Sequence, residues 1–460
     1  DKPRPNTKLI SNTYKFIDTL IGKENKYKAL NDFLDKKHPR IKGIKTGDKI
    51  ISSDEFHKEI PKIISNLDNS YLYIQGPPGT GKTYQAANAI IELLKQNKKI
   101  AITGLSHKVI HNLLQRIEDM ASEKQFEFEG YKRGTLEDDD TVFNGEYIKT
   151  YEKDPVFMNA LKERDKGQIF AGTKYHLAST FYDEKIDYLF IDETGQLSLA
   201  DLISIGNIAK NIILIGDQNQ LGQPIRGTHP NESGQSILDY LLEGKDTISE
   251  DRGIFLNKTY RLNSKLNEFI SSNFYEERLI CDKSTDKRII NFNKKSKIKD
   301  SGIHYIEMNH KNNVQTSIEE FEVIRDLMKE MIGLEFDDKG KKRKLSVDDF
   351  LIISPYNTQV NLLISKLEES KIKNPRVGTI DKFQGQEAPV TIISMTSSDS
   401  DSLPRNKEFF FSRNRLNVAI SRAQVASIIL FNPNLLDSSP KNLDQIKLMN
   451  NFFKLLNYKI

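Results

Sequence analysis

The chain has 460 residues, of which 37% are hydrophobic and 29% charged, and its formal net charge is +4 at pH 7. This length predicts two or three domains. The small net charge permits nucleic-acid binding but is no evidence for it. No apolar run approaches the ~20 residues of a membrane-spanning helix. The single cysteine, Cys281, excludes an intramolecular disulfide and a cysteine-cluster metal site, and it favours a reducing, cytoplasmic setting.

Residues 1–60 form a polar, lysine-rich N-terminal segment. Weak amphipathic patterns predict helices near residues 25–36 and 54–66. The chain begins with Asp1 and shows no signal-peptide pattern, so we expect it to be a fragment of a longer protein.

From Tyr71 the pattern alternates between strands and helices. A strand is predicted at 71–75 and a helix at 84–95, and the residues between them, Gly76-Pro77-Pro78-Gly79-Thr80-Gly81-Lys82-Thr83, fit the phosphate-binding loop G-x-x-x-x-G-K-[ST]. Such a loop cradles a polyphosphate with backbone N–H groups at a helix start, while Lys82 reaches the β- and γ-phosphates and Thr83 holds Mg²⁺. We therefore predict a nucleoside triphosphate and Mg²⁺ as ligands. The loop does not tell what the energy of ATP is used for, and a chance Gly/Pro turn is the alternative.

We assign residues 61–250 to a first α/β domain. Further strands are predicted at 99–103, 168–171, 188–191 and 211–215, and a helix at 107–117. This alternation predicts a parallel sheet whose strand ends face one crevice together with the phosphate-binding loop. Residues 118–166 break the alternation and contain no clear apolar strand, so we interpret them as an insertion, partly helical and partly mobile. Its acidic run, 137–140, is expected to be a solvated loop, and a role in tuning nucleic-acid access is the alternative.

Polar residues follow two of these strands. Asp192 would coordinate Mg²⁺, and Glu193 would orient and deprotonate the attacking water, although an acidic pair that caps the next helix would look the same. The string 216–221, Gly-Asp-Gln-Asn-Gln-Leu, follows the next strand. Within it, Gln220 is our candidate for sensing the γ-phosphate.

Residues 251–460 are predicted to form a second sheet domain, whose alternating pattern starts near Gly253. Strands are expected at 304–308, 350–353, 377–380, 390–395 and 427–431, and helices at 264–274, 317–331, 358–369 and 443–456. Basic clusters at 294–299 and 339–344 are interpreted as solvated loops, with phosphate contacts as the alternative. Arg261 and Arg422 can stabilise charge on a transferring phosphoryl group, and surface salt bridges are the alternative for both.

The ordered strings resemble one family over about residues 70–435. They are 76–83, Ser106-His107, Gly172-Thr173, 192–196, 216–221, Tyr260-Arg261, Ser354-Pro355-Tyr356, 377–387 and 415–423. The set is similar to the superfamily 1 helicases of the Upf-type branch, which typically move 5′ to 3′. The strings 106–114 and 383–389 further resemble the helicase half of bacterial RecB-like nuclease–helicase fusions, which implies a nuclease domain or partner N-terminal to this chain.

The resemblance implies an α/β fold of two tandem RecA-like domains, a P-loop NTPase with ATP between them and single-stranded nucleic acid, DNA rather than RNA, as partner. It also implies roles for individual residues. Tyr260 would stack on adenine, Arg261 and Arg422 would be arginine fingers, and Gly385 and Glu387 would line the nucleotide. The residues expected to follow the strand backbone are Ser106, His107, Thr173, Pro355, Tyr356 and Thr379, with core packing as the alternative for Tyr356 and Thr379.

The sequence departs from the family at two informative places. No glutamine that could read adenine lies between Ile51 and Ser70, and Thr194 stands where alanine is common. Rival interpretations are an AAA+ remodelling ATPase, which shares the phosphate-binding loop, and a nucleotide-regulated binding module without unwinding. The intact Lys82, Asp192 and Glu193 argue against the second, and no convincing nuclease carboxylate cluster is visible.

Overall fold

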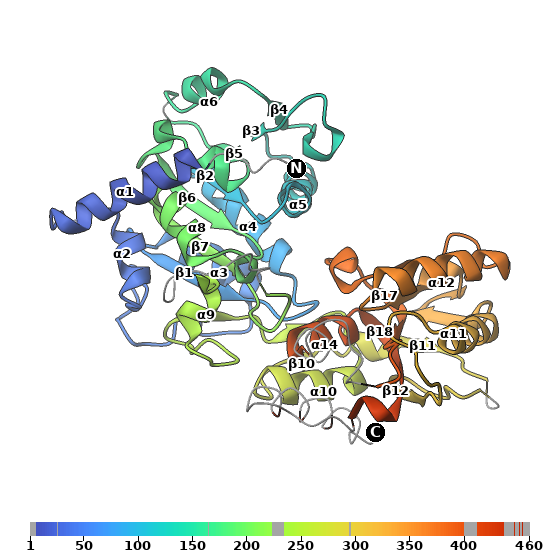
Figure 1. Cartoon of the computed structure of the whole chain (residues 1–460). Helices are drawn as coiled ribbons and strands as arrows, with labels where there is room; N and C mark the ends of the chain where they lie inside the picture. The colour runs from blue at the N-terminus through green and yellow to red at the C-terminus, as the bar shows by residue number, and fades with distance from the viewer. Residues whose placement is uncertain are drawn as a thin grey trace. The chain divides into compact units, whose positions relative to one another are not determined.

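The structure is a computed structural model that describes residues 6–24, 26–163, 165–222, 234–293, 296–399 and 412–436, together with residues 446, 450 and 453. Its contacts divide the chain into two compact units (Figure 1). The first unit contains the described residues up to 76, 81–218 and 222–256, and the second contains 77–80, 219–221 and those from 257 onward. Within the described residues, no helix is both long and apolar enough to cross a membrane.

The first unit is built on an eight-stranded sheet in which every pair of neighbouring strands is parallel. The strand order is β4-β3-β5-β2-β6-β7-β1-β8. The bounds of its strands are β1 Tyr71–Gln75, β2 Lys99–Thr103, β3 Glu129–Arg133, β4 Ile148–Tyr151, β5 Gln168–Ala171, β6 Ile186–Ile191, β7 Ala209–Gly216 and β8 Gly253–Phe255. The bounds of its helices are α1 Thr7–Ile21, α2 Lys28–Leu34, α3 Phe56–Ser65, α4 Lys82–Leu94, α5 His107–Glu123, α6 Asp154–Ala160, α7 Lys174–Leu177, α8 Leu199–Ile205 and α9 Ile237–Leu242.

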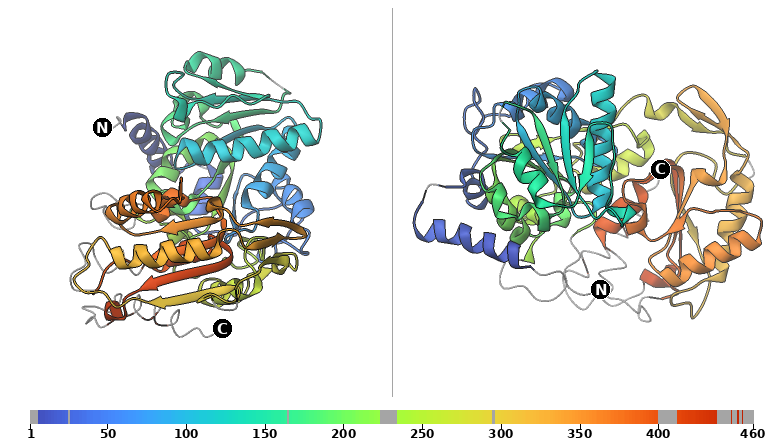
Figure 2. Two further views of the ribbon diagram at one scale, coloured as in Figure 1. Left: turned by 90° about the vertical axis from the view of Figure 1, so that its right-hand side faces the viewer. Right: turned by 90° about the horizontal axis from the view of Figure 1, so that it is seen from above.

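Helices cover both faces of this sheet, because its central strands are apolar on both sides (Figure 2). Leu72 and Ile74 of β1 join one core with helices α3, α4 and α5. Tyr71 points to the opposite face, where its ring meets Phe33 of α2 edge-on at 5.4 Å. The predicted helices at 25–36 and 54–66 are present as α2 and α3, whereas α1 was not predicted.

The strand order places close together the carboxyl ends of the two strands that lead into the candidate site residues. Strand β1 leads into the phosphate-binding loop and β6 ends just before Asp192, and only β7 lies between these two strands. Parallel sheets bind ligands at this edge. The mixed α/β architecture with two parallel sheets is that of tandem RecA-like domains, as predicted.

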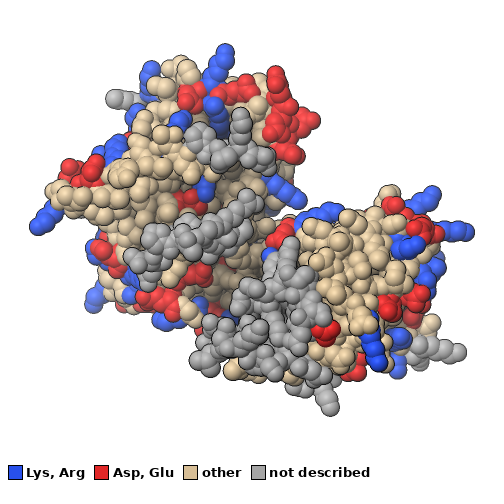
Figure 3. Space-filling model, viewed as in Figure 1, with Lys and Arg blue, Asp and Glu red and all other residues tan. Residues whose placement is uncertain are grey.

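The prediction for residues 118–166 was wrong in one respect, because this segment contains two strands. β3 and β4 pair in parallel and extend the sheet beyond β5. The side chain of Glu118 on α5 holds β4 in place, because its carboxylate accepts hydrogen bonds from the N–H groups of Glu146, Tyr147 and Ile148 at 2.7–3.2 Å. The acidic run at 137–140 is exposed, as expected, and acidic side chains gather on the surface beside β3 and β4 (Figure 3).

The second unit is built on a five-stranded parallel sheet of order β12-β18-β17-β15-β16. A small antiparallel sheet, β11-β13-β14, and a two-stranded sheet, β9-β10, accompany it. The bounds of the strands are β9 Lys258–Thr259, β10 Ile280–Cys281, β11 Arg288–Ile290, β12 Gly302–Glu307, β13 Glu335–Asp338, β14 Lys341–Lys344, β15 Phe350–Ile353, β16 Val377–Gly378, β17 Ala388–Ser394 and β18 Ala423–Phe431. The bounds of the helices are α10 Ser264–Phe274, α11 Ile318–Met331, α12 Asn357–Glu369 and α14 Arg413–Ile420.

Three predictions for this half need correction. Gly253–Phe255 does not start the second sheet, because it is strand β8 at the edge of the first. The basic cluster at 339–344 is not all loop, since Lys341–Lys344 forms the exposed edge strand β14. The strand expected at 377–380 is shorter, because a 3₁₀ turn begins at Ile380. The helix expected at 443–456 lies outside the described residues, apart from residues 446, 450 and 453, which are helical.

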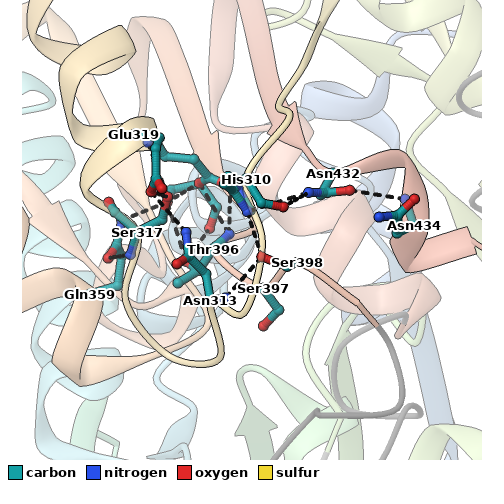
Figure 4. Close-up of polar contacts among 12 residues, drawn as sticks. His310, Asn313, Ser317, Glu319, Gln359, Thr396, Ser397, Ser398, Asn432 and Asn434 are labelled. Atoms are coloured by element: carbon teal, nitrogen blue, oxygen red, sulfur yellow. Dashed lines mark hydrogen bonds and ion pairs between the residues drawn. The ribbon is translucent and has the colours of Figure 1, made fainter.

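A buried polar network joins the strand ends of the second sheet (Figure 4). Glu320 and His310 form an ion pair at 3.2 Å with both side chains fully buried. Glu320 also accepts hydrogen bonds from the Thr396 N–H and the Ser394 hydroxyl, and Asn432 donates to the carbonyl of His310. Burial raises the pKa of Glu320 above its ordinary value, and these donors oppose that rise. The network fixes the loop before α11 to the ends of β17 and β18.

We expect the Glu118→Ala substitution to lower the free energy of unfolding by about 2–3 kcal/mol, because buried N–H groups at the start of β4 lose their acceptor. Urea unfolding followed by circular dichroism measures this change. The control is Glu123→Ala on the exposed end of the same helix, where we expect a change within about 0.5 kcal/mol. Equal effects of the two substitutions would show that Glu118 does not hold β4.

Candidate functional site

The phosphate-binding loop begins directly at the end of β1. The N–H of Gly76 donates to the Gly216 carbonyl of β7 at 3.0 Å, which fixes the start of the loop to the sheet. Gly81 has a φ of +80°, a left-handed conformation that glycine adopts readily, and α4 begins at the next residue. The ammonium of Lys82 donates to the Gly76 carbonyl at 2.6 Å, so the lysine folds back over the loop. Thr83 lies in the first turn of α4, where free N–H groups favour an anion.

The tip of the loop, residues 77–80, groups with the second unit and contacts Thr259–Arg261 there. The hydroxyl of Thr259 donates to the Pro78 carbonyl at 2.8 Å, and the N–H of Tyr260 donates to the Gly79 carbonyl at 2.9 Å. Gly79 has a φ of +73°, and a Cβ atom there would lie 2.4 Å from the Cβ of Arg261. Glycine is therefore the only residue that fits. The ring of Tyr260 is 51% exposed, so it is accessible for stacking.

Asp192 and Glu193 follow β6 in the first unit. Burial and the charge of Glu193 raise the pKa of Asp192 to about 7, and the nearby Lys82 ammonium opposes this rise. Glu193 has a φ of +53°, so the chain turns sharply at this residue, and its N–H donates to the Asp192 carboxylate at 2.9 Å. A buried carboxylate with an acidic neighbour fits Mg²⁺, a hard cation that takes oxygen ligands. Among the described residues, no cluster of three or more His, Cys, Asp or Glu side chains could bind a metal by itself.

Thr194, the departure from the family pattern, holds this turn to the sheet. Its buried hydroxyl lies 2.9 Å from the Ile191 carbonyl and 2.7 Å from the Ile215 carbonyl, and it accepts a hydrogen bond from the Ile215 N–H at 3.0 Å. Alanine could not make these contacts. Thr194 therefore links the end of β6, which carries the two carboxylates, to the end of β7.

In the second unit, Arg261, Glu387 and Arg422 lie close together. Arg261 forms an ion pair with Glu387 and donates to the Ser421 carbonyl at 3.2 Å. Gln424 also donates to Glu387, at 2.7 Å, and Arg422 donates to the Gln386 carbonyl at 3.3 Å. Arg261 therefore forms a salt bridge, which was its alternative in the sequence, whereas Arg422 is buried. Gly385, two residues before Glu387, has a φ of +77°.

Gln220 groups with the second unit and is buried. Its neighbour Asn219 donates to the Phe274 carbonyl at 2.6 Å, and Asn417 donates to the Asn219 carbonyl at 2.7 Å. The structure thus places Lys82, Asp192 and Glu193 in one unit and the candidate phosphate sensor in the other.

The residues expected to follow the nucleic-acid strand lie at the carboxyl ends of the strands. In the first unit, the Ser106 hydroxyl caps α5 by accepting from the Val109 N–H at 3.3 Å, His107 begins that helix, and Thr173 lies at the start of α7 after β5. In the second unit, Pro355 and Tyr356 follow β15. Tyr356 is only 5% exposed, which agrees with its core-packing alternative.

Thr379 is half-buried and precedes the turn at Ile380.

Sequence reasoning missed several residues that position the site. Arg288 of β11 donates to the carbonyls of Tyr260 and Arg261 at 3.1 and 3.0 Å, and Thr259 holds Pro78. Lys132 of β3 lies beneath His107, with 2.9 Å between its Nζ and the histidine Nδ1. Only Thr259 had a signal in the sequence, because it adjoins the Tyr260-Arg261 string; the others contact residues that are distant along the chain.

Comparison with known proteins adds independent information. Two family models, each described as an AAA domain, match residues 61–225 and 234–434. The DNA replication ATP-dependent helicase/nuclease dna2 of Schizosaccharomyces pombe is 28% identical over 406 residues, which cover 80% of this chain and 27% of that protein. The DNA polymerase alpha-associated DNA helicase A of Saccharomyces cerevisiae is 24% identical over 433 residues, which cover 80% of this chain and 63% of that protein.

These matches support a superfamily 1 helicase of the Upf type. The chain spans less than two thirds of the length of these helicase relatives. A solved structure of Arterivirus nonstructural protein 10 (helicase) with DNA covers 79% of the chain and 61% of its own, at a TM-score of 0.41 and 13% identity.

We expect the Glu193→Gln substitution in this helicase to slow ATP hydrolysis by about 10²–10⁴-fold, because the amide cannot accept the proton of the attacking water. ATP binding should survive, since Lys82, Thr83 and Asp192 remain. Single-turnover hydrolysis and direct ATP binding measure the two effects, with Asp192→Asn as the matched comparison that weakens the metal site instead. Normal hydrolysis by Glu193→Gln, or a loss of Mg²⁺ binding equal to that of Asp192→Asn, would mean that the two roles are misassigned.

Proposed function

We propose that this chain hydrolyses ATP to move along single-stranded DNA, in the 5′-to-3′ direction, and that it unwinds duplexes that it meets. One observation carries the proposal: two parallel sheets follow each other in one chain, and each carries a different set of the residues expected to bind the nucleotide. The first presents Lys82 and the carboxylates, and the second presents Tyr260 and the arginines. An ATPase whose two halves both contact one nucleotide can couple hydrolysis to a change between them.

In the first unit, the phosphate-binding loop and the start of α4 hold the phosphates of ATP. Lys82 exchanges the Gly76 carbonyl for the β- and γ-phosphates, since a phosphate is the stronger partner for an ammonium. Thr83 and Asp192 hold Mg²⁺, which neutralises charge on the phosphates. Glu193 orients the attacking water and takes its proton.

In the second unit, Tyr260 stacks on the base, and Gly385 and Glu387 line the nucleotide. Arg261 and Arg422 act as arginine fingers, whose planar forks match the oxygens of the transferring phosphoryl group. Glu387 keeps the Arg261 guanidinium oriented until the phosphate competes for it. Gln220 senses the γ-phosphate.

The nucleic-acid strand lies along the carboxyl edges of the two sheets. Ser106, His107 and Thr173 contact it from the first unit, and Pro355, Tyr356 and Thr379 contact it from the second. Contacts to phosphate and sugar fix the position of the strand without reading its sequence, as a protein that steps along DNA requires. The names of the curated relatives specify DNA, which supports DNA as the substrate.

The chain works with a nuclease domain or partner, as in the bacterial RecB-like nuclease–helicase fusions that it resembles. The name of one relative, a helicase/nuclease, supports such a partner. We place its activity in the cytoplasm, in keeping with its single cysteine.

The test of the proposal is ATP hydrolysis with single-stranded DNA, single-stranded RNA, duplex DNA and no nucleic acid. We expect single-stranded DNA to stimulate hydrolysis most, and the Lys82→Ala variant to lose most of the stimulated rate because the phosphates lose their main cation. Lys62→Ala serves as a control, since it removes an exposed cation of the first unit that lies outside the loop, on α3. A rate indifferent to nucleic acid would favour a remodelling ATPase.

A further inference from the structure

The end of the unpredicted strand β3 and the turn after it help to line a cavity of about 240 Å³ at the carboxyl edge of the first sheet. Two residues already assigned to the nucleic-acid path, His107 and Thr173, line this cavity. Its remaining walls come from elements that the family motifs do not include: Lys8 of α1, Arg133 at the end of β3, Asp138 after it, and Asp154 at the start of α6. All of these residues belong to the first unit.

Lys132 of β3 determines which nitrogen of His107 carries hydrogen. Its side chain is fully buried, with Nζ next to the Thr141 carbonyl and 2.9 Å from Nδ1 of His107. Burial lowers the pKa of Lys132 to about 8. In its protonated form the amine can only donate, and Nδ1 of His107 then accepts while Nε2 carries the hydrogen. The contact holds the imidazole ring in one orientation.

The charges of the cavity suit a single phosphate. Arg133 and Lys8 contribute two positive charges, and Asp138 and Asp154 contribute two negative charges. Both carboxylates already have donors: Asp154 accepts from Arg133 at 2.9 Å, and Asp138 accepts from the Asp140 N–H at 3.2 Å. Because the positive and negative side chains balance, the cavity does not attract a highly charged polyphosphate. A single phosphodiester carries one charge, and the planar guanidinium of Arg133 fits its oxygens.

We propose that this cavity binds one sugar–phosphate unit of the single strand, with the His107 Nε2–H and the Arg133 guanidinium as its donors. The segment 118–166 thereby lengthens the DNA path of the first unit, and Lys132 is a positioning residue for His107. On binding, the phosphate replaces Asp154 as the partner of Arg133. The inference rests on the proposed function, because it extends the same strand path.

The experiment measures affinity for fluorescently labelled single-stranded DNA at several salt concentrations. Each phosphate neutralised by a cation adds about 0.7 to the slope of log affinity against log salt for a single strand. We therefore expect Arg133→Met to weaken binding and to reduce the slope by about 0.7. His107→Gln should weaken binding with an unchanged slope, because a neutral donor releases no counterion. Asp154→Asn should tighten binding, since Arg133 loses the carboxylate that competes with DNA.

Lys149→Met is the matched control, because Lys149 is an exposed cation of the same segment, on β4, that does not line the cavity. For Lys149→Met we expect the same slope of log affinity against log salt as for the unmodified protein. Arg133→Lys keeps the charge and should keep the slope, which separates loss of the contact from misfolding. If the unmodified protein binds single-stranded DNA and Arg133→Met behaves like Lys149→Met, the cavity is not part of the path and the proposed function stands. If the unmodified protein does not bind single-stranded DNA, both proposals are wrong.

Discussion

The structure depends on a buried carboxylate that needs a cation. Asp192 lies at the end of β6, buried and next to Glu193, and its pKa is raised because a charge is costly in these surroundings. Lys82, at the start of α4, is the cation that opposes this rise, and the proposed Mg²⁺ would add a second one. The parallel sheet makes this arrangement possible, because β1 and β6 end at the same edge with only β7 between them. The Thr194 hydroxyl bonds to the backbone at the ends of β6 and β7 and so keeps the carboxylates in place.

The second unit also contains a buried carboxylate, which other side chains stabilise. Its buried Glu320 is paired with His310 and accepts further hydrogen bonds from Ser394 and Thr396, so the strand ends remain fixed (Figure 4). Nearby in the same unit, Glu387 orients Arg261, and Arg288 holds the backbone of the Tyr260-Arg261 turn. Groups that the proposed mechanism uses are thus held in place by contacts within the protein, which reduces the cost of organising them during reaction.

The elements that were predicted correctly are those that a short, contiguous pattern of residues identifies. Apolar strands such as 71–75 and 350–353 were predicted at their true bounds, because buried parallel strands are continuous apolar runs. The edge strands β4 and β14 were missed, because both are short, β14 is entirely basic, and the place of β4 depends on Glu118, which lies elsewhere in the chain. The phosphate-binding loop was evident because its residues are contiguous, whereas Lys132 and Arg288 act on residues 25 or more positions away.

The direction of movement along DNA tests the central claim most directly. Single-stranded oligonucleotides carrying biotin–streptavidin at either the 3′ or the 5′ end are incubated with the protein and ATP, and the rate of streptavidin release is measured. A 5′-to-3′ translocase pushes streptavidin off the 3′ end, so release should be ATP-dependent and faster from the 3′ end than from the 5′ end. Release from the 5′ end alone, or no release while DNA still stimulates ATP hydrolysis, would contradict the account.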